Sequence, residues 1–198
     1  MCDPLSAPAR TGKGSLIIIS APSGAGKTTI VNRLLRNVSG LRRSISYTTR
    51  KPREGEIDGK DYFFLSQSEF LNKKRRGFFL EWANVFGKFY GTGESWCVEQ
   101  IEKGYCVILT IDVQGMRKIE RKLRKKIRLI SIFIMPPSLS VLKERLTRRK
   151  TDSPAEIEKR LLISAKEMKA RSEYDFTVVN HNVRDSVKRI KKILNSVK

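Results

Sequence analysis

Residues 20–29, SAPSGAGKTT, follow directly on the apolar run of residues 16–19. Gly24 and Gly26 let several backbone N–H groups of a turn point inward, and Lys27 can reach an anion held there. A helix that starts behind such a turn adds further N–H donors. A simple turn between a strand and a helix has no use for a lysine and hydroxyls at these positions. The segment therefore predicts a site for the phosphates of a nucleoside triphosphate.

The loop differs at one position from the phosphate-loop pattern G-x-x-x-x-G-K-[ST], because Ala21 stands at the first glycine. Ala21 leaves the loop usable, since the two remaining glycines still allow a close approach of the backbone. The hydroxyl of Thr28 is placed to hold Mg²⁺ beside the bound phosphates. The residues expected to bind ATP here are Ser23, Gly24, Ala25, Gly26, Lys27, Thr28 and Thr29.

Alternating apolar and amphipathic segments must position this loop. Strands are expected at residues 16–20, 106–112, 128–135 and 176–180, and helices at residues 28–36, 113–125 and 183–197. Continuous β-branched strands separated by helices indicate a parallel sheet covered on both faces. Residues 46–92 break this rhythm with glycine turns and short aromatic strands such as residues 62–65, which indicates an insertion.

The length and composition are those of one globular domain without a membrane span. A chain of 198 residues can bury roughly 70% of its unfolded surface. The apolar runs are shorter than the ~20 residues that cross a bilayer. The three cysteines, Cys2, Cys97 and Cys106, lack metal-ligand spacing and are interpreted as reduced thiols of a cytoplasmic protein.

The net charge of +21, from 41 Lys and Arg against 20 Asp and Glu, is unusually basic. Basic faces bind nucleic-acid backbones by releasing counterions. They also suit an enzyme that acts on small polyanions. Because no helix-turn-helix, zinc-finger or RNA-binding signature accompanies the charge, nucleic acid is expected to be a weak, charge-driven partner and not a required one.

A second anion site is indicated by residues 44–62, SISYTTRKPREGEIDGKDY. Arg50 and Arg53 flank a Lys-Pro pair, and two forked guanidinium groups at this spacing can grip one phosphate. Each charge-assisted hydrogen bond of this kind is worth about 1.5–3 kcal/mol.

Together with residues 79–92 (FLEWANVFGKFYGT) and 108–115 (ILTIDVQG), this segment resembles guanylate kinase. The match runs in order over nearly the whole chain after the N-terminal tail, and these middle motifs are specific to that family. The resemblance implies an α/β phosphate-loop NTPase fold of three α/β/α layers with a parallel sheet core. It implies a flexible tail (1–14) and one domain (15–198), made of a core (15–45, 93–137 and 168–198), a GMP-binding insertion (46–92) and a helical lid (138–167).

The resemblance also implies transfer of the γ-phosphoryl group of ATP to GMP, and to dGMP, giving ADP and GDP. Residues matched to the family's GMP phosphate site are Arg50, Arg53, Tyr62 and Tyr90, and those matched to its guanine site are Ser46, Glu81, Thr92 and Asp112. A carboxylate only accepts hydrogen bonds, so Glu81 suits the N1–H and N2–H₂ donors of guanine. Adenine would leave it unpaired, a mismatch that a site can reject by ~10⁴–10⁵. Tyr62 and Tyr90 could instead be core aromatics.

Lid arginines complete the implied catalytic set. The resemblance implies that Arg145, Arg149 and Arg160 close over the transferring group, alongside Lys27 and Arg50, and that Asn180 lies on the adenine side. Residues 153–156, Ser-Pro-Ala-Glu, predict a capping box that starts the second lid helix. No general base is expected, because the phosphate of GMP is already ionised near neutral pH.

Three residues depart from the family pattern: Thr110 replaces an acid, Lys150 a glycine, and His181 an acid after Asn180. Two alternatives are a non-catalytic module that binds phosphopeptides and a related kinase for another small phosphate such as a sugar phosphate. The first has no need of Lys27 and the lid arginines, and the second has no need of the guanine set. A monomer and a homodimer are equally compatible with the sequence.

Overall fold

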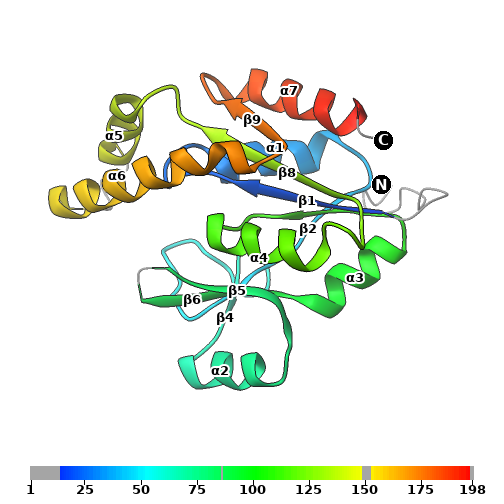
Figure 1. Ribbon diagram of the computed structural model, residues 1–198. Helices are drawn as coiled ribbons and strands as arrows, with labels where there is room; N and C mark the ends of the chain where they lie inside the picture. The colour runs from blue at the N-terminus through cyan, green and yellow to red at the C-terminus, as the bar shows by residue number, and fades with distance from the viewer. Residues whose placement is uncertain (1–13, 86, 149–152, 197–198) are drawn as a thin grey trace. The chain divides into compact units, whose positions relative to one another are not determined.

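The computed structural model describes residues 14–85, 87–148 and 153–196 (Figure 1). The strands in chain order are β1 (Ser15–Ser20), β2 (Leu41–Arg43), β3 (Tyr47–Thr48), β4 (Phe63–Phe64), β5 (Phe79–Val85), β6 (Lys88–Gly93), β7 (Cys106–Leu109), β8 (Leu129–Met135) and β9 (Phe176–Val179). The helices are α1 (Lys27–Asn37), α2 (Gln67–Arg75), α3 (Glu94–Glu102), α4 (Val113–Leu123), α5 (Leu139–Arg148), α6 (Pro154–Lys169) and α7 (Val183–Ser196), with a 3₁₀-helix η1 (Ala170–Glu173).

The strands form two sheets. The five-stranded sheet has the order β2-β7-β1-β8-β9, and the four-stranded sheet has the order β4-β3-β6-β5. In the larger sheet β2 and β7 pair in parallel, as do β8 and β9. In the smaller sheet β6 pairs antiparallel with both β3 and β5. The expected α/β fold with a parallel sheet core and helices on both faces is confirmed.

Most of the expected elements are confirmed to within one or two residues, but the strand expected at residues 106–112 is shorter. It ends at Leu109, because Asp112 adopts extended backbone as the N-cap of α4 and its side chain accepts a hydrogen bond from the N–H of Gly115. The strand expected at residues 62–65 is limited to β4, since Ser66 already begins the capping box of α2. Helix α7 is described as far as Ser196.

The described chain forms two compact units. One contains residues up to Ile17 and residues 40–129, and the other contains residues 18–39 and residues from 130 onward. In the first unit an aromatic core supports the small sheet: Phe70 of α2 is fully buried and stacks on Phe79 of β5 and Phe89 of β6, with ring centroids 4.4 Å and 5.4 Å apart. The predicted insertion therefore has a hydrophobic core of its own.

Every residue of β8 is buried, and in the second unit α1 packs against α7 (Figure 1). Helices α5 and α6 pack on each other through Leu142, Leu146 and Ile157. The expected capping box is confirmed, with Ser153 as N-cap of α6 and Pro154 as its first residue. The division into core, insertion and lid stays a prediction.

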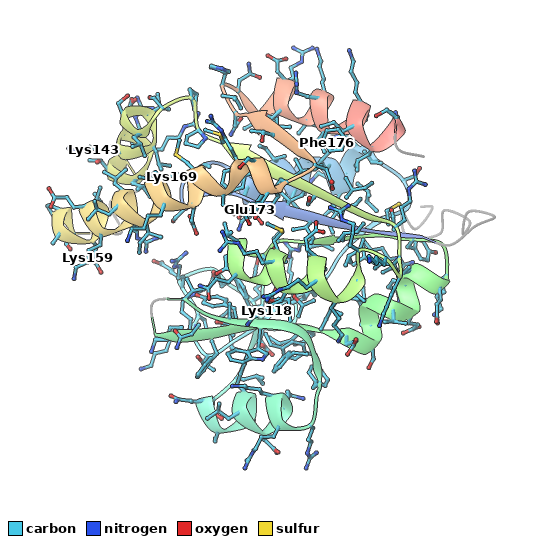
Figure 2. All side chains as sticks on the ribbon, in the orientation of Figure 1. Lys118, Lys143, Lys159, Lys169, Glu173 and Phe176 are labelled. Carbon is cyan, nitrogen blue, oxygen red and sulfur yellow. The ribbon has the colours of Figure 1, made fainter. Side chains whose placement is uncertain are left out.

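Exposed lysines lie on the outer surface of these two helices. Lys143 on α5 and Lys159 on α6 are exposed and extend away from the helix pair (Figure 2). Among the described residues, none of the helices is long and apolar enough to cross a membrane.

Candidate active site

The phosphate loop lies in the second unit, between β1 and α1. Gly24 and Gly26 have φ angles of 91° and 95°, the left-handed region that favours glycine. Gly26 is the N-cap of α1 and makes no side-chain cap, so the first N–H groups of the helix can face an anion. Lys27 is the first residue of α1, and Thr28 next to it is exposed. The local geometry is that of an anion site.

Two of the three predicted lid arginines form hydrogen bonds at or beside the phosphate loop. Nη1 of Arg160 donates a hydrogen bond to Oγ of Ser23 at 2.9 Å. Nη2 of Arg145 donates to the backbone oxygen of Asn180 at 3.1 Å. Arg149 and Lys150 lie outside the described residues. The packing of α5 against the loop also involves Gly24, where an added Cβ would lie 3.0 Å from a methyl group of Leu146.

A cavity of about 320 Å³ opens beside the loop. Its lining residues come from the loop, the end of α5, the turn after β9 and the start of α7: Gly24, Gly26, Arg145, Arg148, Asn180, His181, Asn182 and Val183. Arg148, His181, Asn182 and Val183 were not predicted as site residues from the sequence, because no local pattern marks them as the lining of a pocket. The cavity is a candidate site for the base and ribose of the nucleotide whose phosphates the loop is predicted to bind.

The first unit contains the predicted guanine residues. Glu81 on β5 is 5% exposed, and its Oε1 accepts a hydrogen bond of 2.7 Å from the hydroxyl of Thr92 on the paired strand β6. Burial raises the pKa of Glu81 to about 7, against the lowering effect of the Thr92 hydrogen bond, and the charge of Asp112 raises it further. The carboxyl group is thus held in one position with a pKa near neutrality.

Helix α4 contacts Glu81 through Gly115. A Cβ atom at this position would lie 2.7 Å from Oε2 of Glu81, closer than real contacts allow. Lys118, one turn further along α4, reaches β5 and donates to the backbone oxygen of Trp82 (Figure 2). The close approach of Glu81 explains the glycine at position 115 of the helix, where glycine costs about 1 kcal/mol relative to alanine. The motif of residues 108–115 contained Gly115, but its role could not be predicted without the fold.

The other two predicted guanine residues, Asp112 and Ser46, also belong to the first unit. Asp112 caps α4, with its Oδ1 accepting from the N–H of Gly115 at 2.8 Å. Ser46 directly precedes β3 and is half-buried, and its carbonyl oxygen accepts from the N–H of Phe63 at 2.9 Å.

The residues predicted to bind the phosphate of GMP also belong to the first unit. Arg50 forms an ion pair with Glu56 at 2.9 Å, and its guanidinium lies 5.3 Å from the ring centroid of Tyr62. The rings of Tyr62 and Tyr90 are 6.1 Å apart and half-buried, outside the aromatic core. The backbone N–H of Arg53 donates to the other carboxylate oxygen of Glu56 at 2.8 Å.

Glu56 was missed as a functional candidate from the sequence. Burial opposes its ionisation, but the hydrogen bonds from Arg50 and Arg53 outweigh that effect and lower the pKa of Glu56. A carboxylate that holds both arginine segments sets their spacing. The sequence did contain a signal for this contact. Glu56 is six residues after Arg50 and can reach its guanidinium only if the chain turns, and Gly55 before it favours such a turn.

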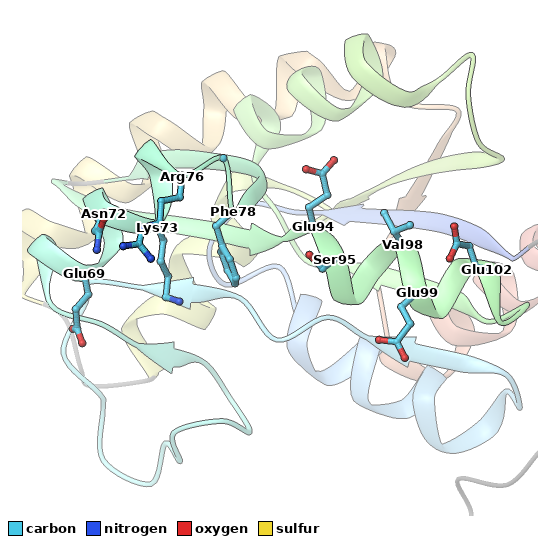
Figure 3. Close-up of a pocket in the computed structure, with 11 residues that line it drawn as sticks. Glu69, Asn72, Lys73, Arg76, Phe78, Glu94, Ser95, Val98, Glu99 and Glu102 are labelled. Carbon is cyan, nitrogen blue, oxygen red and sulfur yellow. The ribbon is translucent and has the colours of Figure 1, made fainter.

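A larger cavity of about 920 Å³ lies in the first unit between α2 and α3 (Figure 3). None of the predicted site residues lines it. Its two sides carry both signs of charge, including Lys73 and Arg76 on one and Glu94, Glu99 and Glu102 on the other (Figure 3). Because acidic groups line it, it does not suit a nucleotide phosphate.

Comparisons with known proteins agree on one family. The family model described as guanylate kinase matches residues 13–197. Guanylate kinase of Wolbachia sp. subsp. Brugia malayi (strain TRS) is 47% identical over 183 residues, which are 92% of this chain and 93% of that protein. Guanylate kinase of Cupriavidus metallidurans is 42% identical over 185 residues, 93% of this chain and 84% of that protein.

A solved structure gives the same result. The crystal structure of guanylate kinase from Anaplasma phagocytophilum matches with a TM-score of 0.77 and 35% identity, over 93% of this chain and 86% of that one. On these grounds the chain belongs to the guanylate kinase family.

Proposed function

We propose that this chain transfers the γ-phosphoryl group of ATP to GMP, giving ADP and GDP, with Glu81 as the residue that selects guanine. ATP-dependent phosphorylation of GMP is the activity of the family to which the chain belongs. The observation that supports the selection is the buried carboxyl group of Glu81, held by Thr92 at 2.7 Å.

Glu81 can accept hydrogen bonds from both N1–H and N2–H₂ of guanine when it is ionised. Adenine has no proton on N1 and would leave the carboxylate desolvated and unpaired, which is costly in a buried site. Thr92, Asp112 and Ser46 complete the proposed guanine site. A kinase for a sugar phosphate would not need a carboxyl group buried in this way.

Arg50, Arg53, Tyr62 and Tyr90 are proposed to hold the phosphate of GMP. The ion pair with Glu56 keeps the guanidinium of Arg50 in place before the ligand arrives, and this reduces the entropy lost on binding. The tyrosine hydroxyls would donate to the phosphate oxygens. This grip fixes the acceptor oxygen for in-line attack on the γ-phosphorus.

On the donor side, the loop N–H groups and Lys27 would bind the ATP phosphates. Arg145, Arg149 and Arg160 would neutralise the charge that spreads over the equatorial oxygens during transfer. The attacking phosphate oxygen of GMP carries no proton near neutral pH, so no residue has to remove one. Lys27 and the arginines have no evident purpose in a non-catalytic module that only binds phosphopeptides.

The residues also suit Mg²⁺ as the accompanying ion. The described part of the chain has no group of three or more His, Cys, Asp or Glu that could hold a metal alone. Mg²⁺ in such sites takes most of its ligands from phosphates and water, and the exposed hydroxyl of Thr28 is a suitable single protein ligand. The ion would supply charge neutralisation between the β- and γ-phosphates.

Three further expectations concern the alternative acceptor dGMP, the cellular compartment and nucleic acid. None of the proposed contacts involves the ribose 2′-hydroxyl, so dGMP is expected to serve as an acceptor. Cys97 and Cys106 are free thiols, which supports a reducing compartment such as the cytoplasm, where ATP and GMP occur. The +21 charge supports only weak, salt-sensitive binding to nucleic acid.

The direct test measures ADP release from Mg-ATP in the presence of GMP, dGMP, AMP, CMP or UMP. Activity confined to GMP and dGMP is the expected result, because only guanine offers two donors to Glu81. Equal rates with AMP would contradict the guanine assignment, and ATP binding without turnover on any acceptor would contradict the kinase.

A second prediction concerns Gly115. Gly115→Ala is expected to raise the KM for GMP about 10-fold or more and to leave the KM for ATP unchanged, since the new methyl group must displace the Glu81 carboxylate, and such overpacking costs about 1–3 kcal/mol. Steady-state kinetics against each substrate would check this. Gln114→Ala, on the exposed side of the same helix turn, is the matched control. An unchanged KM for GMP would show that Glu81 needs no such close approach.

A further inference from the structure

Asn180 joins the phosphate loop to two other elements of the second unit. It follows β9 and is 2% exposed. Its side-chain Nδ2 donates a hydrogen bond of 2.7 Å to the carbonyl oxygen of Ala25 in the loop. Its Oδ1 accepts one of 2.9 Å from the hydroxyl of Ser186 on α7, and its backbone N–H donates to Met135 of β8 at 2.7 Å. Both polar atoms of the side chain therefore have a hydrogen-bond partner inside the protein.

The chemistry of these partners fixes the orientation of the amide. The carbonyl of Ala25 can only accept, so the NH₂ group of Asn180 must face it and Oδ1 must face Ser186. Ser186 is also 2% exposed, and its one hydroxyl proton is shared between Asn180 and the carbonyl of Asn182 at 3.0 Å. Ser186 thus holds Asn180 in the orientation that the loop requires.

The bond to Ala25 also orients the next N–H group of the loop. The protein has no cis peptide among its described residues, so the Ala25 carbonyl and the Gly26 N–H point in opposite directions. With the carbonyl tied to Asn180, the Gly26 N–H points away from Asn180. A Cβ on Gly26 would lie 2.6 Å from Nδ2 of Asn180, so the side chain packs directly against the loop backbone.

We propose that Asn180 and Ser186 are positioning residues for the phosphate loop. Ser186 acts through Asn180, and Asn180 acts through the Ala25 carbonyl to aim the Gly26 N–H at the donor phosphates. The backbone oxygen of Asn180 also accepts from Arg145, so the same residue supports a lid arginine. This role rests on the proposed function of the loop and differs from a direct contact between the Asn180 side chain and the donor base.

The test compares two variants with a matched control. Asn180→Asp replaces the donating NH₂ group with an oxygen that faces the Ala25 carbonyl, and Ser186→Ala removes the hydroxyl that holds the amide. Ser131→Ala is the control, because Ser131 is another fully buried serine of this unit, and its hydroxyl bonds to Asp175 at 2.9 Å, away from the loop. If Asn180→Asp does not fold, Ser186→Ala is the milder change that decides the question.

Calorimetry would measure the dissociation constants of Mg-ATP and of Mg-tripolyphosphate, which has phosphates but no base. Asn180→Asp is expected to weaken both about 10-fold, because it loses the hydrogen bond to the loop carbonyl of Ala25, and Ser186→Ala about 3-fold, because it loses the hydrogen bond that orients Asn180. Hydrogen exchange at the amides of residues 23–28 should become faster in both variants. The KM for GMP should stay as in the wild type.

Other outcomes would overturn the proposal. Weakening of ATP but not of tripolyphosphate would mean that Asn180 acts on the base. Effects equal to those of Ser131→Ala would mean general destabilisation. If the wild type fails to phosphorylate GMP, the proposed function fails, but tripolyphosphate binding and loop exchange still decide whether Asn180 and Ser186 position the loop.

Discussion

Replacing Glu81 by glutamine is expected to lower kcat/KM for GMP by about 10²–10⁴, through the loss of two charge-assisted hydrogen bonds worth about 1.5–3 kcal/mol each. Glutamine keeps the shape of the side chain, but its NH₂ group opposes a donor of guanine. Initial rates at varied GMP and saturating ATP measure the effect. ATP binding should stay unchanged, because the loop and Lys27 are not altered. Wild-type kinetics with GMP would remove Glu81 from the guanine site.

The same substitution is expected to make the fold more stable at alkaline pH. The pKa of Glu81 lies near 7 in the folded protein, against 4.5 as its ordinary value. The folded state therefore binds more protons between these values, and the free energy of unfolding falls as the pH rises from 4.5 to 7. Glutamine has no charge to lose. Glu81→Gln should thus exceed the wild type by about 3 kcal/mol at pH 8 and match it near pH 4.

Denaturant unfolding at these two pH values would measure the difference. Thr92→Val is a useful comparison, because it removes the hydrogen bond to the carboxylate and should destabilise the ionised form more than the neutral one. A stability difference between Glu81→Gln and wild type that does not change with pH would contradict a raised pKa.

Replacing Arg160 by alanine is expected to lower kcat by about 10³ or more with little change in the KM for GMP. An arginine that neutralises the transferring phosphoryl group is worth about 10³–10⁵ in rate. Arg160 reaches the hydroxyl of Ser23 at 2.9 Å, so its side chain already extends to the phosphate loop. Lysine should restore only part of the rate, since it lacks the forked geometry of the guanidinium.

Single-turnover kinetics would measure this effect on the transfer step. Lys159→Ala is the matched control, because Lys159 precedes Arg160 on α6, carries the same charge and is exposed. Equal losses in the two variants would show that only the general charge of the helix matters. A loss confined to Arg160 supports its proposed contact with the transferring group.

The parts that could be predicted from the sequence depend on short local patterns. The turn around Gly24 and Gly26, and the start of α6 at Pro154, are encoded within a few residues. The predicted end of the strand at residue 112 was wrong, because the apolar run of residues 106–112 gives no sign that Asp112 is needed as the N-cap of α4. Local composition cannot show whether such a residue continues a strand or caps the following helix.

Contacts between distant segments could not be predicted in this way. Ser186 lies on a helix 160 residues after Gly26, and its importance depends on a hydrogen bond to Asn180. Gly115 looks like a weak helix residue until the position of Glu81 is known. The resemblance to the family named the residues expected to touch the substrates, but not those that hold them in place.

The stacked rings of Phe70, Phe79 and Phe89 have a consequence for how such an enzyme can change over generations. They give the segment proposed to bind the acceptor a hydrophobic core of its own, formed by residues that lie close together in the chain. A lineage can therefore alter β5 and β6 by single substitutions, and try a new acceptor, while its inherited donor loop stays intact. We expect natural variation in acceptor preference to be concentrated in this segment and donor chemistry to persist.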